Sequence, residues 1–194
     1  MNTLAQDESY SRAVGRNSAA ACCCFFTDPG LYLSDFKAVI SSRDSLRLWS
    51  DSDWPEDDFS AEINGRELQF HVDDNEAHEA YGYMLFGPTR TQCYGSLYVN
   101  PAGSLLEYYV LEHGSAASLD RLDARIDYWL SEDCMDLQQQ LSALIYEWIN
   151  REWPLCAGIT GRGAARQALY ESIEMTHSHT LCSRETGGAL YLYE

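Results

Sequence analysis

Two histidines near the end of the chain have the spacing that most directly suggests metal chemistry. His177 and His179 are separated by one residue, so an extended segment would place both imidazoles on one side. A zinc ion would need a third ligand from elsewhere, such as Cys182 or a carboxylate, and we therefore predict no metal site. His71 and His78 lie seven positions apart, and we interpret them as surface residues on one face of a helix.

Carboxylates are concentrated between Asp51 and Glu79, where eleven acidic residues stand beside one arginine, Arg66. The whole chain has a formal net charge of -17, and Lys37 is its only lysine. Binding of nucleic acid through its phosphates depends on Lys and Arg, so this charge argues against a nucleic-acid partner. Two interpretations of the acidic stretch stay open: a solvated surface that maintains solubility, or a surface for a cationic partner or an amine substrate.

The cysteines and the apolar runs indicate the compartment. None of the seven cysteines forms a Cys-x-x-Cys pair, so neither a zinc ribbon nor a thioredoxin motif is present, and we expect reduced cysteines that serve packing. No run of about 18 apolar residues occurs, and the N-terminus lacks the basic start of a secretory signal. We therefore expect a cytoplasmic protein without a membrane partner. The sequence also contains no Ser-His-Asp, P-loop or dinucleotide-binding fingerprint.

The elements that must position a site are organised around residues 81–153. The composition predicts two strands joined by a Gly-Pro turn, at Tyr81–Phe86 and Gln92–Val99. It also predicts a third strand at Asp123–Leu130. A long amphipathic helix should follow, from about Glu132 to Glu152. We expect one domain over residues 28–194, with residues 1–27 as a flexible or loosely docked arm.

The flanking segments complete the expected order of elements. They predict a short strand at Leu31–Leu33, a helix from Phe36 to about Leu46, a helix over Phe59–Ala80 broken near Asn64 and Gly65, a strand at Leu155–Ile159, a helix at Gly163–Met175 and a strand at Ala189–Tyr193. Residues 103–122 separate two strands, and they form either an excursion that covers the sheet or an additional strand and loop.

Three stretches together resemble a known family. Gln92–Pro101 is similar to the long fourth strand of the GNAT acetyltransferase superfamily, and Ala124–Leu130 is similar to its fifth strand. Ala164–Ile173 resembles the family's helix motif Ala-x-x-Leu-Tyr-Glu-Lys-Leu-Gly-Phe. The resemblance covers roughly residues 30–194. It implies an α+β, three-layer fold with a mixed, largely antiparallel sheet and helices on both faces, and it implies acetyl-CoA as the cofactor and an amine as the acetyl acceptor.

The sequence departs from the family at the phosphate-binding loop. The resemblance implies Gln/Arg-x-x-Gly-x-Gly/Ala between the fifth strand and the long helix, where backbone amides and the helix dipole hold the pyrophosphate. Residues 131–138 contain no glycine and carry Glu132, Asp133 and Asp136. We interpret these acids as caps of a helix that has lost the phosphate cradle.

The resemblance also assigns roles to individual residues. Tyr170 corresponds to the tyrosine that protonates the leaving thiolate, although a tyrosine there could instead pack its ring and hydrogen-bond its hydroxyl. Asp127 and Glu107 are candidate proton acceptors by position. The cofactor would lie against the end of the fifth strand and the start of the helix, at Trp129, Leu130, Cys134, Leu137 and Gln138.

Three hypotheses follow, and each predicts a different structure. An N-acyltransferase predicts an open V-shaped cleft between the fourth and fifth strands, with Tyr170 facing it. A catalytically inactive binding or regulatory module predicts a cleft filled by Trp129, Tyr128 or Met135, with a protein partner on the acidic surface. An acidic mimic of nucleic acid predicts carboxylates spaced like phosphates along one exposed face. The sequence leaves the oligomeric state open.

Overall fold

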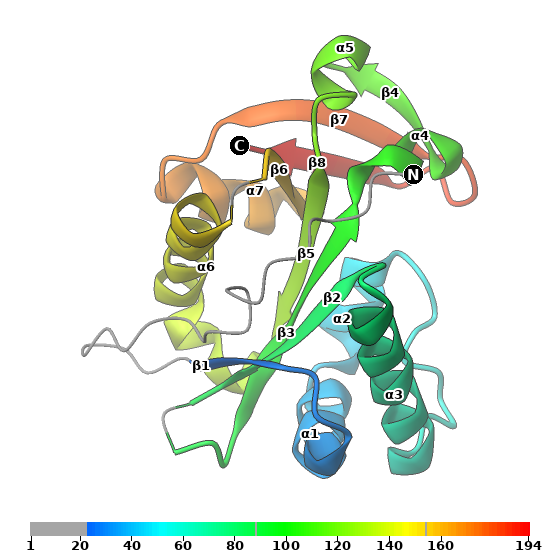
Figure 1. Ribbon diagram of the computed structural model, residues 1–194, viewed down its shortest axis with the longest axis vertical. Coiled ribbons are helices and arrows are strands. Elements are labelled where there is room, and N and C mark those ends of the chain that lie inside the picture. The colour runs from blue at the N-terminus through cyan, green and yellow to red at the C-terminus, as the bar shows by residue number, and fades with distance from the viewer. Residues whose placement is uncertain (1–22, 88, 154) are drawn as a thin grey trace.

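One twisted sheet organises the computed structural model, which describes residues 23–87, 89–153 and 155–194. Within these residues, eight strands follow the order β1-β2-β3-β5-β6-β8-β7-β4 (Figure 1). The β5–β6 pair is parallel, and the other neighbouring pairs are antiparallel. The strands are β1 (Cys23–Phe26), β2 (Tyr81–Phe86), β3 (Cys93–Pro101), β4 (Tyr109–His113), β5 (Ala124–Leu130), β6 (Ala157–Gly161), β7 (His177–Ser183) and β8 (Ala189–Tyr193).

Helices cover both faces of the sheet (Figure 1). One face carries α1 (Tyr32–Ser41), α2 (Arg43–Ser50) and α3 (Ala61–Ala77), and the other carries α6 (Gln138–Glu152) and α7 (Gly163–Ser172). Short elements complete the described chain: η2 (Pro29–Leu31), η3 (Ala102–Ser104), α4 (Leu105–Tyr108), α5 (Ala116–Leu119) and η4 (Glu132–Leu137). No helix among the described residues has the length and apolar character needed to cross a membrane.

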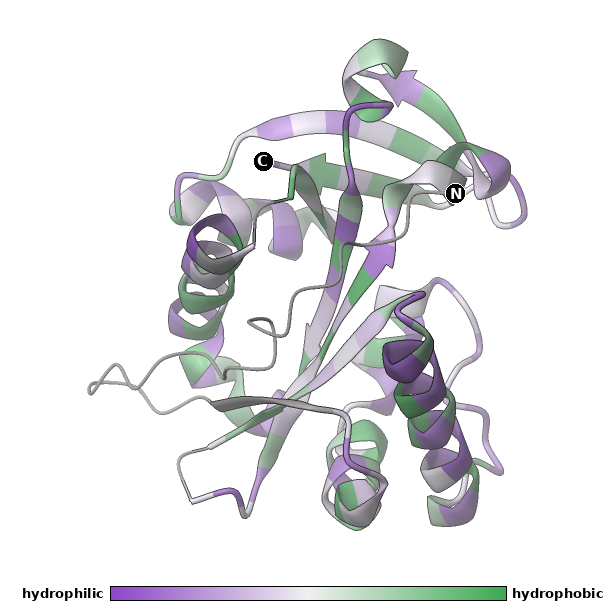
Figure 2. Cartoon of the chain, in the orientation of Figure 1, coloured by the Kyte–Doolittle hydropathy of each residue, from purple (hydrophilic) through white to green (hydrophobic). Residues whose placement is uncertain are grey.

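Strand alternation divides the core into two main layers. In β5, the side chains of Ile126 and Tyr128 pack toward α6 and α7, whereas Trp129 packs toward α1, α2 and α3. Burial of these large apolar side chains is the main favourable contribution to folding. Figure 2 shows many hydrophilic residues along the exposed parts of α3, as expected for a helix that buries only one stripe. The three-layer mixed sheet confirms the predicted fold class.

The N-terminal half differs from the prediction in three places. Leu31–Leu33 is helical instead of extended, because Asp28 accepts a hydrogen bond from the amide of Gly30 and Pro29 starts a helical turn that continues into α1. The helix predicted to end near Leu46 is divided at Ser42 into α1 and α2. Residues 23–26 of the predicted arm form the edge strand β1, while residues 1–22 lie outside the described residues.

The break predicted in α3 is also absent. The helix runs through Asn64 and Gly65, because Asn64 Nδ2 donates to the carboxylate of Asp35 at 3.0 Å and to the carbonyl of Tyr32 at 3.1 Å. These bonds fasten α3 to α1 and outweigh the poor helix propensities of Asn and Gly. Asp35 is 3% exposed, and this burial raises its pKa.

The C-terminal half contains a strand that the sequence did not indicate. Residues 177–183 form β7, which pairs with β8 on one edge and β4 on the other. Within residues 103–122, the structure confirms the alternative of an additional strand, β4. The predicted strands at residues 81–86 and 189–193 and the long helix before Trp153 are confirmed.

The predicted position of the V-shaped cleft was wrong. The strands expected to part, β3 and β5, are joined without a break from the pair Gly95–Leu130 to the pair Pro101–Ala124. The strands that part are β5 and β6, whose ladder ends at the pair Ile126–Ile159. Beyond that pair, β6 continues its pairing with β8 instead. Our match of β3 and β5 to the family's fourth and fifth strands was therefore displaced by one strand.

A β-bulge in β3 fixes the far end of β5. The β2–β3 register shifts between Leu85 and Phe86, so that Tyr94 is the extra residue, and Gly95 beside it has a φ of 144°. The carbonyl of Tyr94 accepts the amide of Ser131 at 2.8 Å, which connects the bulge to the start of η4. Only glycine adopts such a φ without strain, so the bulge depends on this residue type.

We predict that Gly95→Ala destabilises the protein by roughly 3 kcal/mol or more, from backbone strain together with a steric collision. A Cβ at this position would collide with the backbone carbonyl of Trp129. Gly103→Ala is the matched control, because a Cβ there meets nothing within 4 Å. Urea unfolding measures both variants, and equal midpoints would show that the bulge tolerates a side chain.

Candidate functional site

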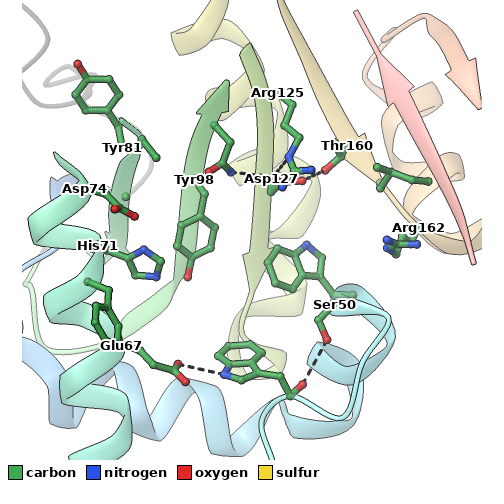
Figure 3. Close-up of a pocket in the computed structure, with 18 of the residues that line it drawn as sticks. Ser50, Glu67, His71, Asp74, Tyr81, Tyr98, Arg125, Asp127, Thr160 and Arg162 are labelled. Atoms are coloured by element: carbon green, nitrogen blue, oxygen red, sulfur yellow. Dashed lines mark hydrogen bonds and ion pairs between the residues drawn. The ribbon is translucent and has the colours of Figure 1, made fainter. Parts of the chain in front are cut away.

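A pocket of about 470 Å³ lies between the helices α2 and α3 and the strands β2, β3, β5 and β6. Figure 3 shows Glu67, His71 and Asp74 projecting from α3 into the pocket, with His71 directed toward Tyr98 on β3. The floor of the pocket includes Asp127, which lies where β5 and β6 part. Side chains from the N-terminal helices thus meet the centre of the sheet in one cavity.

Aromatic rings form much of the wall. The ring of Tyr98 lies 4.9 Å from that of His71 and 6.3 Å from that of Trp49, measured between centroids. Trp54 adds a further indole to the lining. Burial raises the pKa of the Tyr98 hydroxyl, which therefore stays protonated. Ring faces of this kind attract cations.

The spacing of Glu67, His71 and Asp74 explains why they share the pocket, because residues four and seven positions apart lie on one face of a helix. Trp54 Nε1 donates to Glu67 Oε2 at 3.1 Å, and burial raises the pKa of this carboxyl group. The carboxylate of Asp74 makes no hydrogen bond or ion pair with a residue that the structure describes. Asp74 is therefore available to a ligand.

The two arginines of the pocket are already paired with acids. Arg125 Nε lies 2.8 Å from Asp127 Oδ2, and Arg162 Nη1 lies 3.3 Å from Asp51 Oδ2. Arg162 also donates to the hydroxyl of Tyr109 at 3.0 Å. These pairs leave the α3 carboxylates as the uncompensated charges, so the pocket favours a cationic ligand.

A hydrogen-bond network fixes the floor. Thr160 Oγ1 lies 2.5 Å from Asp127 Oδ1 and 3.3 Å from the carbonyl oxygen of Ile126. The hydroxyl group has one proton, and it donates this proton to the nearer acceptor, Asp127 Oδ1. Asn100 Nδ2 donates to Asp127 Oδ2 at 3.1 Å. The Asp127 carboxylate is thus held in one orientation, in contact with a hydroxyl group that also lines the pocket.

The structure brings together two of the three residues that the sequence suggested for catalysis. Asp127 lines the pocket, whereas Tyr170 is fully buried on the α7 side, where its hydroxyl donates to the carbonyl of Thr160 at 2.7 Å. This burial raises the pKa of Tyr170 well above its usual value. Asp127 and Tyr170 therefore contact the same residue from two sides. Glu107 is exposed on α4 and does not line the pocket.

The residues suggested for cofactor binding lie at the end of β5 and the start of α6. The side chains of Trp129, Leu130 and Cys134 are buried, and that of Trp129 belongs to the core under α1, α2 and α3. Leu137 and Gln138 are half-buried. Their role in binding a cofactor stays a prediction.

The segment between β5 and α6 has backbone amides that are already paired within the protein. Four successive amides have acceptors within the protein: Ser131 N donates to Tyr94 O at 2.8 Å, Glu132 N to Ser42 Oγ at 2.9 Å, Asp133 N to Ser131 Oγ at 3.3 Å and Cys134 N to Ser131 O at 3.0 Å. The side chains of Glu132, Asp133 and Asp136 are exposed around them. These four amides therefore offer no unpaired donor to the diphosphate of coenzyme A, and the exposed side chains beside them carry negative charge.

Most of the pocket was not recognised from the sequence. We had interpreted His71 as a surface residue, yet its ring lies against that of Tyr98, tilted by 43°, inside the pocket. The seven-residue interval from Glu67 to Asp74 was visible in the sequence. The approach of Trp49 and Tyr98 was not, because they are 49 positions apart and meet only through tertiary packing.

The two C-terminal histidines have structural partners. His179 is buried, with Nε2 lying 2.8 Å from Ser118 Oγ and Nδ1 lying 2.9 Å from Ser178 Oγ. A register shift in β7 separates it from His177. In the described part of the chain, no three His, Cys, Asp or Glu side chains are grouped so that they could hold a metal ion.

Neither a protein-family model nor a curated protein sequence matches this chain. Several solved structures are similar to it in fold. The ribosomal L7/L12 alpha-N-protein acetyltransferase RimL, in complex with coenzyme A, is similar with a TM-score of 0.65 at 15% identity, covering 94% of this chain and 96% of that one. The microcin C7 self-immunity acetyltransferase MccE, in complex with acetyl-CoA and AMP, has a TM-score of 0.63 at 11% identity, covering 90% and 92%. A GNAT-family acetyltransferase from Bacillus anthracis has a TM-score of 0.59 at 9% identity, covering 91% and 95%.

These similarities define the class of fold: a mixed sheet with one parallel pair that opens between two layers of helices. The chain has the fold of the GNAT acetyltransferases, as the order of its elements had suggested. At such low identity, the likeness establishes the fold, and the function must be argued from the site.

We predict that His71 titrates below its usual value of 6.5, because burial lowers its pKa. The folded state then binds fewer protons than the unfolded state, so stability falls as the pH drops through about 6.5 toward the lowered pKa. An NMR titration of the imidazole protons measures the midpoint, and the His71→Gln variant should lose this part of the pH dependence. A midpoint at or above the usual value would contradict the burial of the ring.

Proposed function

We propose that this protein is an N-acyltransferase that transfers an acyl group, with acetyl from acetyl-CoA as the reference donor, to an amine bound in the pocket. One observation carries the proposal: the floor of the pocket, at Asp127 and Thr160, is the place where the parallel strands β5 and β6 part. An acceptor in the pocket would therefore meet a donor that lies along the parted strands. The GNAT fold supports this reading by analogy.

The acceptor would bind as a cation. Asp74 and Glu67 supply negative charge on one side, and the rings of Trp49 and Tyr98 supply π-faces. Such surroundings stabilise an ammonium ion by about 0.5–2 kcal/mol per favourable ring contact, in addition to the attraction of the carboxylates. A primary amine on an extended, cationic molecule has the matching chemistry.

The nitrogen that attacks must be a neutral amine, so the ammonium group attracted by Asp74 and Glu67 would be a second, cationic group of the acceptor. The residues at the floor could remove the one proton that the attacking nitrogen loses as the amide forms. Thr160 lines the pocket and donates its own proton to Asp127, so its oxygen lone pairs can accept a proton from the nitrogen while Asp127 receives the proton of Thr160. Asn100 and Arg125 hold Asp127 in place during this transfer. The bound thioester would supply the acyl group and the leaving thiolate.

The direct test mixes the purified protein with acetyl-CoA and a panel of amines, and follows both acylated product and released thiol. The expected result is turnover of at least one cationic amine. If no amine is acylated while the same amines bind, the acyltransferase function is wrong and the second candidate below is favoured.

We predict opposite kinetic signatures for two acidic residues of the pocket. Asp74→Asn should raise the KM for the amine roughly tenfold with kcat nearly unchanged, because it removes a charge that contacts the bound cation. Asp127→Asn should lower kcat about 100-fold, the usual contribution of a positioned base. Asp73→Asn is the matched control, since Asp73 is exposed on the same helix and outside the pocket. Steady-state kinetics would contradict the assignment if Asp73→Asn and Asp74→Asn behaved alike.

Tyr170 was suggested as a proton donor, and its contact with Thr160 offers a different role. We propose that it is a positioning residue, because its hydroxyl proton is directed at the Thr160 carbonyl. Tyr170→Phe should then cost about 1 kcal/mol of unfolding free energy, the worth of one hydrogen bond, without changing the shape of the pH–rate profile. Loss of one limb of that profile, with a 100-fold or larger loss of kcat, would instead identify Tyr170 as the acid.

A second candidate function is an amine-binding or regulatory module without catalysis, which could use its acidic surface for a protein partner. The specific observation in its favour is the segment before the long helix, where the amides of residues 131–134 are occupied and the exposed carboxylates of Glu132, Asp133 and Asp136 lie nearby. Under this function the pocket binds cations, but no thioester is consumed.

A further inference from the structure

Arg162 lines the pocket on the side opposite the acids of α3 (Figure 3). Its Nη1 atom lies 3.3 Å from Asp51 Oδ2 and donates to the carbonyl oxygen of Ala189 at 3.1 Å, and its Nη2 atom donates to the hydroxyl of Tyr109 at 3.0 Å. A guanidinium has five N–H donors, so Nε and one proton of Nη2 make no bond with a residue that the structure describes. Arg162 can therefore still donate to a ligand, although its charge is already balanced by Asp51.

Asp51 is held against Arg162 by segments that are distant in the sequence. It ends α2 with a φ of 57°, and its Oδ2 atom accepts a hydrogen bond from the hydroxyl of Thr186, in the turn between β7 and β8. Gly188 in the same turn leaves room for the carboxylate, because a Cβ there would collide with it. The position of the Asp51 carboxylate is thus fixed by α2, by the turn and by Arg162 together.

This carboxylate decides what else can bind beside Arg162. An anionic group of a ligand would lie next to a second anion, and the repulsion between the two offsets the attraction of the guanidinium. Arg125 is balanced by Asp127 in the same way. The described lining of the pocket contains these two arginines and no lysine, so it offers no uncompensated positive charge.

We propose that Asp51 determines the specificity of the pocket, by excluding amines that carry a carboxylate, such as free amino acids, and admitting amines that carry none. The carboxylate of an amino acid would lie near the Asp51–Arg162 pair or near the acids of α3, and both places are unfavourable for an anion. The inference rests on the proposed function, since it names the class of amine that this function would use.

The test measures the binding of three probes to the full chain by calorimetry at neutral pH: cadaverine, lysine and lysinamide. Lysine is cadaverine with one carboxylate added, and lysinamide has an uncharged group of nearly the same size in place of that carboxylate. We expect lysine to bind roughly tenfold or more weakly than the other two probes, because it alone carries an anion. Equal dissociation constants for lysine and lysinamide would overturn the proposal, and so would the failure of cadaverine to bind.

Asp51→Asn removes the charge and keeps the shape of the side chain, and asparagine tolerates a positive φ. The ratio of the dissociation constants of lysine and cadaverine should fall roughly tenfold, because Arg162 becomes free to pair with the carboxylate of lysine. Asp53→Asn is the matched control, since Asp53 is exposed in the same loop and outside the pocket, and it should leave the ratio unchanged. Thermal unfolding checks that each variant is folded. An unchanged ratio in a folded Asp51→Asn variant would overturn the proposal.

The double variant Asp51→Asn/Arg162→Gln shows whether the change comes from Arg162. The improved binding of lysine should disappear, because no guanidinium remains to pair with the carboxylate. If Asp51 served only to hold α2 against the turn, its substitution would weaken all three probes alike and leave their ratios unchanged, which would contradict the proposal. Improved binding of lysine that persists in the double variant would contradict it as well.

The outcomes separate this inference from the proposed function. Selective binding of cadaverine without acylation of any amine would support the role of Asp51 and refute the acyltransferase. Acylation of lysine and cadaverine with similar kcat/KM would leave the acyltransferase standing and refute the role of Asp51.

Discussion

The early end of one parallel ladder is the constraint on which the site depends. β5 and β6 share three residue pairs and then part, and Thr160 marks the point of separation. Its hydroxyl group contacts Asp127 on β5, its carbonyl accepts the hydroxyl of Tyr170 from α7, and its backbone pairs with Leu192 on β8. One residue thus connects the pocket, the gap and both neighbouring strands. Without this parting, the centre of the sheet would be an uninterrupted ladder with no room for a reacting group.

The charges on the two faces of the sheet are arranged differently. On the α3 face, Glu67 and Asp74 enter an aromatic pocket whose arginines are already neutralised by Asp127 and Asp51. On the α7 face, Arg166 lies against two tyrosine rings with a buried donor unpaired. A cationic ligand would be attracted to the α3 face, where the carboxylates are not neutralised. The net charge of -17 fits such a ligand.

The segment between β5 and α6 shows how a bulge can occupy backbone amides of a neighbouring segment. Gly95 permits the bulge at Tyr94, and the carbonyl of Tyr94 then takes the amide of Ser131. The side-chain oxygen of Ser42, in the N-terminal half of the chain, accepts a hydrogen bond from the next amide, that of Glu132. These contacts commit the amides of residues 131 and 132 to the protein itself.

The sequence alone determined the order of most of the main elements and, through its resemblance to a known family, the three-layer fold. It also named Asp127 as a candidate by position. Periodicity and turn residues give local structure, and the order of strands and helices limits how they can pack. It also showed that no glycine-rich loop precedes the long helix. It did not determine which strands part, because β3–β5 and β5–β6 pairing are both compatible with the same local patterns.

Tertiary structure decided the composition of the site. The 49-residue separation of Trp49 from Tyr98, and the meeting of Arg166 with Tyr128, leave no local pattern in the sequence. The continuity of α3 depended on Asn64 reaching Asp35, a contact that overrode local propensity. Pockets and buried polar pairs form where distant segments close over one another, and only the packed chain specifies which side chains meet there.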